Sequence, residues 1–149
     1  MSGPIPPRGR VLGVDLGEVR IGLAVTDPAQ TVATPLDTLS VQPEDDPAGI
    51  AEDLAEAADA HLAVGIVLGL PRTLDGREGP AAHRARDIAG RLPDHLAVDL
   101  WDERFSTTEA ERVMIEQGAR RRERRRAIDR VAATLILQTW LDARRHGRP

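Results

Sequence analysis

Two short apolar runs joined by a polar turn stand near the start of the chain. Residues 11–16 and 21–25 are apolar almost throughout and too short for helices, which favours strands buried on both faces. The four residues between them, 17–20, include a glycine and suit a hairpin connection. Asp15 is the one acid inside the first run, and a buried carboxylate needs a charged or hydrogen-bonding partner. We therefore expect Asp15 either to accept hydrogen bonds from turn amides or to act in a metal or phosphate site.

The remaining apolar runs predict three more strands. Residues 31–39 form a third strand, which Pro35 would break or place at a sheet edge. Residues 63–70 are apolar throughout, as in an interior strand parallel to the first. A fifth strand covers residues 97–101. The order of elements predicts an α/β fold in which the first strand is central, paired with the second and the fourth.

Helical spacing and capping residues predict four helices. Asp46 caps the first, with Pro47 at its first position. A second helix covers roughly residues 79–92. A capping box at residues 106–109 begins a third, which Gly118 ends. A last helix runs to about Arg145. The basic stretch over residues 120–126 is expected to link the third helix to this last one.

Acidic residues converge at one edge of this predicted sheet. Ligands of such sheets bind beyond the carboxyl ends of parallel strands, where Asp15, the loop over residues 69–77 and Asp102-Glu103-Arg104 all lie. Because neighbouring strand residues face opposite sides, only one of Asp102 and Glu103 can share the side of Asp15. Asp129 falls at the margin of the last helix's apolar stripe; it either faces the sheet or pairs with Arg125 or Arg126.

Three carboxylates at one edge favour a hard, oxygen-liganded cation. Mg²⁺ or Mn²⁺ is therefore the expected cofactor. A site that binds two such ions can activate water for phosphodiester cleavage. Arginines near the same edge either hold phosphates or are solvated surface residues. The residues in question are Arg20, Arg72 and Arg104.

The charge of the chain is divided unevenly. The net charge is −4, yet residues 118–149 carry ten arginines against three acids, and lysine is absent throughout. The densest stretch predicts a contact with a polyanion, although such a run can also be a solvated linker. Its arginines are Arg120, Arg121, Arg122, Arg124, Arg125 and Arg126. Aromatic residues are too few for a base-stacking platform, so we expect recognition of backbone and shape, as in structured RNA or branched DNA.

Composition excludes several other functions. The chain has no cysteine, hence no disulfide, cysteine-bound zinc or thiol nucleophile. No phosphate-binding loop, dinucleotide fingerprint or serine-nucleophile motif occurs. No run is long and apolar enough for a bilayer, and the proline-rich N-terminus lacks a signal sequence, so we expect a cytoplasmic protein without a membrane partner.

The predicted organisation is a flexible tail over residues 1–9, one domain over 10–145 and a C-terminal tail over 146–149.

Four sets of residues together resemble the YqgF/RuvX family over about residues 10–145. They are Gly13-Val14-Asp15-Leu16-Gly17 with Arg20-Ile21-Gly22-Leu23-Ala24; Gly69-Leu70-Pro71 with Asp75-Gly76; Asp102-Glu103-Arg104 with Thr107-Thr108-Glu109-Ala110; and Ile128-Asp129-Arg130-Val131-Ala132-Ala133 with Ile136-Leu137-Gln138. Members are RNase H-like proteins described as Holliday junction resolvases and as pre-16S rRNA nucleases.

The resemblance implies an RNase H-like mixed five-stranded sheet of order 3-2-1-4-5, flanked by helices. It carries catalytic and metal-binding roles onto Asp15, Glu103 and Asp129. It implies a nuclease that matures the 5′ end of pre-16S ribosomal RNA or resolves branched DNA, as a monomer or homodimer.

Two other classes of function remain as alternatives. One is a nucleic-acid-binding factor without strong catalysis, although a pure binder has no need to aim three acids at phosphates. The other is an actin-like phosphate-binding domain, because a Gly-x-Asp-x-Gly hairpin also occurs there. That arrangement needs two such lobes, and 149 residues leave room for one.

Overall fold

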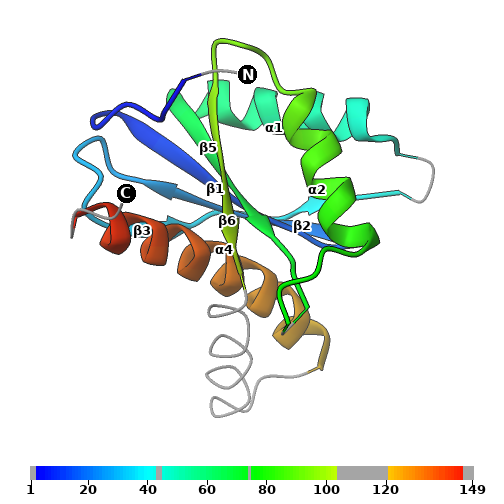
Figure 1. The fold of residues 1–149 in the computed structure, drawn as a ribbon. Coiled ribbons are helices and arrows are strands. Elements are labelled where there is room, and N and C mark those ends of the chain that lie inside the picture. Colours follow the sequence, from blue (N-terminus) through cyan, green and yellow to red (C-terminus); the bar gives the residue numbers. More distant parts are fainter. Residues whose placement is uncertain (1–2, 43–44, 74, 104–120, 146–149) are drawn as a thin grey trace.

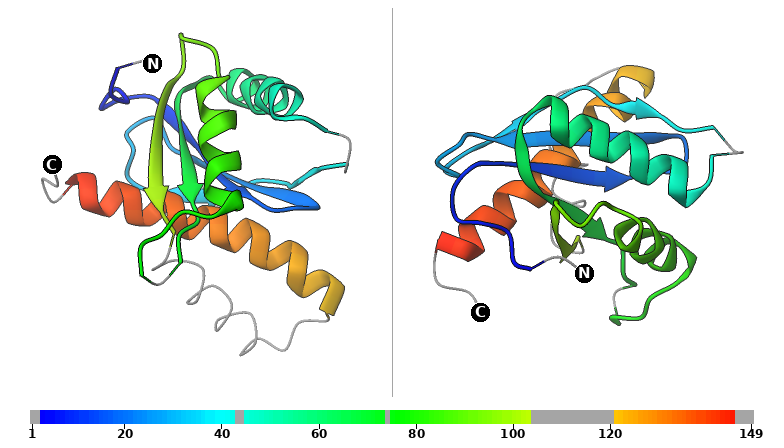
Figure 2. Two further views of the ribbon diagram at one scale, coloured as in Figure 1. Left: turned by 45° about the vertical axis from the view of Figure 1, so that its right-hand side comes forward. Right: turned by 90° about the horizontal axis from the view of Figure 1, so that it is seen from above.

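The computed structural model describes residues 3–42, 45–73, 75–103 and 121–145, with the backbone alone for 121–130. A central sheet is covered by α1 and α2 on one face and by α4 on the other (Figures 1 and 2). The elements are β1 (Arg10–Leu16), β2 (Arg20–Thr26), β3 (Ala33–Pro35), β4 (Leu39–Ser40), α1 (Pro47–Ala60), β5 (Ala63–Leu70), α2 (Pro80–Gly90), β6 (Ala97–Asp102) and α4 (Arg121–Arg145).

Apart from the additional strand β4, the sheet has the order predicted from the sequence. Its strands run β3-β2-β1-β5-β6, with β2 antiparallel to β1 and both β5 and β6 parallel to it in sense. The central position of the first strand is therefore confirmed. The hairpin turn is also confirmed, because the Gly17 amide donates to the Arg20 carbonyl at 2.9 Å.

The sheet has six strands rather than the predicted five. The predicted strand over residues 31–39 forms two short strands, β3 and β4, which both pair with β2. Pro35 ends β3, because proline cannot donate a ladder hydrogen bond. At the other edge, β6 extends one residue further than predicted, to Asp102.

The helices form where their caps indicate. The Asp46 carboxylate accepts a hydrogen bond from the Gly49 amide at 2.8 Å, and Pro47 occupies the first turn of α1. The helix predicted from Ser106 to Gly118 lies outside the described residues. The basic stretch does not link two helices as predicted: residues 121–126 are the first turns of α4. Arginine is a good helix former, so the charge run does not stop the helix.

Strand alternation divides the core into two layers. Leu12 and Val14 point to α1 and α2, whereas Val11 points to α4. Gly13 lies on the α4 side, where a β-carbon would come within 2.8 Å of Leu137 Cβ and 3.2 Å of the Ala133 carbonyl oxygen. The missing side chain lets α4 approach β1 closely.

The N-terminal segment predicted as a flexible tail makes several contacts. Ile5 is buried in the α4 layer, and the Arg144 guanidinium donates to its carbonyl. The Gln30 side-chain amide donates to the carbonyls of Pro6 and Gly9 at 2.8 and 3.0 Å. These contacts hold part of that segment against the domain. Within the described part of the chain, no helix combines the length and apolarity needed to cross a bilayer.

Candidate active site at the carboxyl edge of the sheet

Asp15 lies near the end of the central strand β1, on the face that α4 covers. Val11 and Gly13 point to that face, and Asp15 follows them at the strand period of two. Its side chain is partly exposed, unlike the four buried residues before it, 11–14. The Asp15 carboxylate is therefore held on a rigid element while remaining open to solvent.

Glu103 reaches Asp15 from the edge of the sheet. It follows β6 directly, and its amide donates to the Leu70 carbonyl at 3.3 Å, which continues the pairing of β6 with β5. Its carboxylate lies over Gly69 of β5, the strand that separates β6 from β1. A hydrogen bond joins the Glu103 and Asp15 carboxyl groups. Two predicted site residues, 88 positions apart in sequence, are thus in contact.

The surroundings of Glu103 favour its protonated form. Burial is the largest cause, followed by the negative charge of Asp15, the hydrogen bond between the two carboxyl groups and the charge of Asp102; together they raise the pKa of Glu103 to about 8. Two carboxyl groups this close share a proton or bind a cation, because they cannot both carry an uncompensated charge.

Asp102 lies on the opposite face of the sheet from Glu103. It follows Val98 and Leu100, which pack against the α1 and α2 layer, and it pairs with Arg72 at 3.8 Å. The predicted separation of Asp102 and Glu103 by strand alternation is confirmed, and the carboxylate that meets Asp15 is that of Glu103.

Arg72 belongs to a network that the sequence did not indicate. Its guanidinium also pairs with Glu78 at 3.3 Å, and Arg86 of α2 holds both oxygens of Glu78 at 2.6 Å. The hydrogen bond from Arg86 is the largest cause lowering the pKa of Glu78 to about 2. This network fixes the loop after β5, while the Arg72 side chain stays about one-third exposed on the face of the sheet that carries Asp102.

The backbone of α4 places Asp129 at the same edge. Ala133, Ile136 and Leu137 are fully buried against the sheet, and position 129 stands one helical turn before Ala133 on the same stripe. Ile136 approaches Gly69 and Leu137 approaches Gly13, whereas Arg144 reaches Ile5 before β1. The helix therefore begins at the carboxyl edge of the sheet and ends at the other.

The other arginines predicted to contact nucleic acid lie in β2, in α4 or outside the described residues. Arg20 is partly buried and begins β2 at this same edge. Arg104 and Arg120 lie outside the described residues. Five more stand in the opening turns of α4, namely Arg121, Arg122, Arg124, Arg125 and Arg126.

The described donors suit a hard divalent cation. Asp15 and Glu103 offer paired carboxylate oxygens, the ligands that Mg²⁺ and Mn²⁺ prefer. The space over Gly69 is already shaped for the second carboxylate, since a β-carbon there would collide with Glu103. Among the side chains that the structure describes, no cluster of three potential metal ligands occurs. The side chain of Asp129 is not among them.

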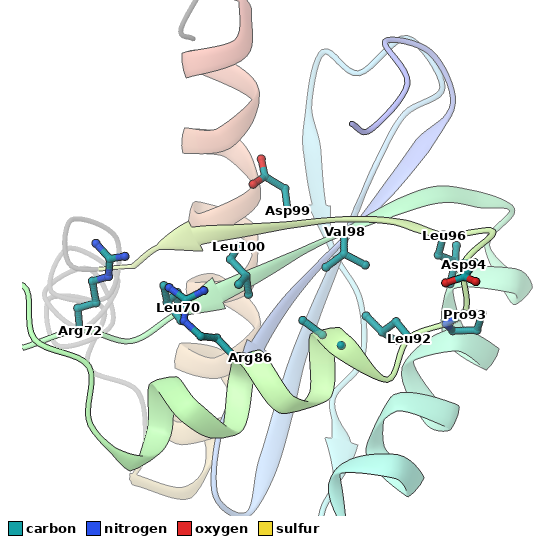
Figure 3. Close-up of a pocket in the computed structure, with 12 residues that line it drawn as sticks. Leu70, Arg72, Arg86, Leu92, Pro93, Asp94, Leu96, Val98, Asp99 and Leu100 are labelled. Carbon is teal, nitrogen blue, oxygen red and sulfur yellow. The ribbon is translucent and has the colours of Figure 1, made fainter. Parts of the chain in front are cut away.

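A separate groove lies on the other face, between α2 and β6 (Figure 3). Its volume is about 530 Å³, and apolar side chains such as Leu92, Val98 and Leu100 line it. Arg72 and Arg86 stand at one end, and Pro93 and Asp94 at the other. Because Asp15 and Glu103 face α4, this groove is distinct from the carboxylate site.

Comparisons with known proteins agree on one family. A family model described as "RuvX: Holliday junction resolvase" matches residues 9–143. A protein of Mycobacterium sp. (strain KMS), named "Putative pre-16S rRNA nuclease", is 45% identical over 94% of this chain and 83% of its own length. A protein of Pelotomaculum thermopropionicum with the same name is 44% identical over 94% of this chain and 90% of its own length.

The solved structures include a protein of similar fold. The RuvC protein of T. thermophilus, solved in complex with a Holliday junction substrate, aligns with a TM-score of 0.56 at 15% identity. The alignment covers 94% of this chain and 97% of RuvC. At that identity the similarity concerns the fold, and it confirms the predicted RNase H-like class.

Proposed function

Because the chain belongs to the RuvX family of Holliday junction resolvases, we propose that it is a metal-dependent nuclease that hydrolyses phosphodiester bonds during 5′-end maturation of pre-16S ribosomal RNA. The observation that carries the proposal is the contact between Asp15 and Glu103 over Gly69. The names of the curated relatives point to ribosomal RNA as the substrate. With such a substrate, the protein would act in the cytoplasm.

Asp15, Glu103 and Asp129 are the proposed catalytic residues. Their carboxylates would hold Mg²⁺ or Mn²⁺, in a site for two ions, and the bound cations would activate water and stabilise the leaving oxygen. Asp15 is fixed by the central strand. Glu103, whose pKa is raised by burial and by Asp15, would release its proton to solvent on binding a cation with Asp15.

The arginines around this edge are the proposed contacts to the nucleic acid. Arg20 begins β2 at this edge, Arg72 follows β5 on the face of Asp102, and Arg104 follows Glu103 directly in the sequence. The basic start of α4 would extend the contact along the phosphate backbone, in a monomer or a homodimer. The partner is structured RNA or branched DNA, read through backbone and shape.

A second substrate is supported by a specific observation. The family description names Holliday junctions, and the RuvC structure with the same fold holds one. Resolution of branched DNA is therefore the alternative activity of the same carboxylates. A binding factor without strong catalysis is the third outcome to be tested.

A cleavage assay distinguishes these functions. The protein is incubated with Mg²⁺ or Mn²⁺ and either a precursor of 16S ribosomal RNA or a four-way DNA junction, with a linear duplex as the unbranched control. We expect cleavage of the precursor, and its loss in Asp15→Asn, whose neutral side chain still fits the site. Cleavage of the junction alone would favour the resolvase. Binding without cleavage of either would favour the binding factor, and full activity of Asp15→Asn would contradict the site.

A further inference from the structure

Gly69 occupies the point where the Glu103 side chain crosses the sheet. Gly65, Val67 and Gly69 of β5 face α4 in alternation, and β5 lies between β1 with Asp15 and β6 with Glu103. A β-carbon built on Gly69 would come within 3.5 Å of Glu103 Cδ and 2.9 Å of Ile136 Cδ1, and it would collide with Glu103 Oε2. Any other residue at this position would occupy the space that the carboxylate uses.

Strand spacing explains why this crossing needs a glycine. The backbones of β1 and β6 are about 10 Å apart, two strand spacings, so neither carboxylate can meet the other by extending directly above its own strand. Glu103 instead lies flat across the neighbouring strand, and only a residue without a side chain leaves room under it. A glycine inside a strand weakens that strand, and it is expected where a close approach requires it.

We propose that Gly69 is a positioning residue of the active site: its missing side chain lets the Glu103 carboxylate cross β5 and complete the cation site with Asp15. The inference rests on the proposed nuclease function, because it assigns Glu103 a cation to hold. The position of Gly69 inside β5 makes this a property of the sheet and not of the loop that follows.

The same strand contains a matched control. A β-carbon on Gly65 would also be crowded, at 2.9 Å from both the Ala97 carbonyl oxygen and Ile5 Cγ1. Gly65 lies four residues earlier on the same face, at the far end from the carboxylates. The obstacles differ in kind, because backbone cannot move aside at Gly65, whereas the ends of two flexible side chains can do so at Gly69.

The two alanine substitutions should therefore affect different properties, cation affinity in Gly69→Ala and thermal stability in Gly65→Ala. In Gly69→Ala the Glu103 carboxylate moves, so we expect affinity for Mn²⁺ or Mg²⁺ alone, measured by isothermal titration calorimetry, to fall by about 10- to 100-fold, as for other substitutions that disturb ligand positioning. The melting temperature should change little. In Gly65→Ala the melting temperature should fall and the cation affinity should stay the same. Equal cation affinity in Gly69→Ala and the native protein would overturn the proposal.

A double-mutant cycle separates positioning from a general effect on the site. If Gly69 acts through Glu103, then Gly69→Ala should weaken cation binding in the native background and have no further effect in Glu103→Gln. The same loss in both backgrounds would show that Gly69 acts elsewhere.

A crystal structure of cation-free Gly69→Ala tests the geometry even if the native protein binds neither ion. We expect the Glu103 carboxylate to have left its contact with Asp15. A native protein that binds neither ion would contradict the proposed function, whereas an unmoved Glu103 would contradict the role of Gly69.

Discussion

In the proposed role of Glu103 as a metal ligand, its carboxyl group would have to lose a proton, and its surroundings oppose that loss. Burial and the neighbouring Asp15 keep its pKa near 8, far above the ordinary 4.5. A divalent cation held by Asp15 and Glu103 would reverse this balance, because its positive charge would offset the repulsion between the two carboxylates. Without a cation, ionisation of Glu103 would place two negative charges in contact at this site.

This residue-scale electrostatics gives a pH dependence of stability. Between about pH 4.5 and 8 the folded protein retains a proton on Glu103 that the unfolded chain has released. Because the native state then binds more protons, its stability should fall as pH rises through this window. We expect the melting temperature in a chelator to decline from pH 5 to 8, and Glu103→Gln to remove this part of the decline. The opposite slope would contradict the assigned pKa direction.

The two neighbouring acids at the end of β6 should differ in importance. Glu103→Gln removes a carboxylate that contacts Asp15, whereas Asp102→Asn weakens an ion pair with Arg72 on the other face. In the cleavage assay we expect Glu103→Gln to lose at least about 100-fold in rate, a size typical of acid–base or ligand residues, and Asp102→Asn to lose far less. The reverse ranking would place Asp102 in the site.

Strand periodicity made part of this site predictable from the sequence. It placed Asp15 on the central strand and separated Asp102 from Glu103, and the resemblance then selected Glu103. The role of Gly69 was not predicted, because a glycine in an apolar run indicates a close approach without naming the group that approaches. Glu78 and Arg86 were missed for a related reason: their pairing depends on how the loop after β5 folds back onto α2.

At the scale of elements, the position of α4 over β1 determines where the third acid stands. Gly13 meets Leu137 and the Ala133 carbonyl, so the helix axis lies close to the strand. Trp140 donates to Asp99 at 2.8 Å and Trp101 donates to Thr139 at 2.9 Å, which ties α4 to β6 as well. The helix that carries Asp129 thus packs against β1, which carries Asp15, and is hydrogen-bonded to β6, which precedes Glu103.

Crowding at Gly13 should therefore affect both stability and activity. A methyl group in Gly13→Ala meets the Leu137 Cβ and helix backbone, neither of which can rotate away, so α4 must move. We expect a loss of about 1–3 kcal/mol in the free energy of unfolding, as for other overpacked cores, together with slower cleavage. Urea unfolding and the cleavage assay measure the two effects.

Gly90→Ala provides the comparison, because a β-carbon on Gly90 meets nothing within 4 Å. It should leave both quantities near those of the native protein. If Gly13→Ala behaved like Gly90→Ala, α4 would not be held by this contact.

Caps and apolar runs in the sequence predicted most element boundaries. The predictions were wrong where packing against the rest of the fold determines the boundary. The Asp46 cap and the apolar run over residues 63–70 gave α1 and β5 correctly. The basic stretch was expected to link two helices, because a run of like charges is often a solvated linker. In the structure the long apolar stripe that follows anchors α4, and the helix extends back through residues 121–126.

At the scale of the whole molecule, the charge distribution matches the direction of α4. An acidic body precedes a segment with ten arginines, and that segment's helix begins at the edge where Asp15 and Glu103 meet. A polyanion bound at the start of α4 would thereby be brought to the carboxylates, and the acidic remainder of the chain would repel it elsewhere. The asymmetry thus favours one orientation of the bound nucleic acid.

Three substitutions test whether the start of α4 holds the phosphate backbone. Replacing Arg121, Arg122 and Arg125 by Gln keeps good helix formers, so stability should change little. Binding should weaken to a similar extent for all sequences, because phosphate contacts carry no base information. The slope of log affinity against log salt should become shallower by about 0.7–0.9 for each phosphate that the variant no longer neutralises.

A matched triple variant removes the same charge elsewhere. Arg8, Arg91 and Arg145 are exposed and stand before β1, after α2 and at the end of α4. The parallel strands start at this side of the sheet, so these arginines lie at the opposite edge from the carboxylates. Replacing these three by Gln should lower affinity slightly through net charge and leave the salt slope almost unchanged, because counterions are released only where phosphates are bound. Equal slopes for the two triple variants would mean that Arg121–Arg125 is a solvated helix end, with the nucleic acid held by Arg20, Arg72 and Arg104 instead.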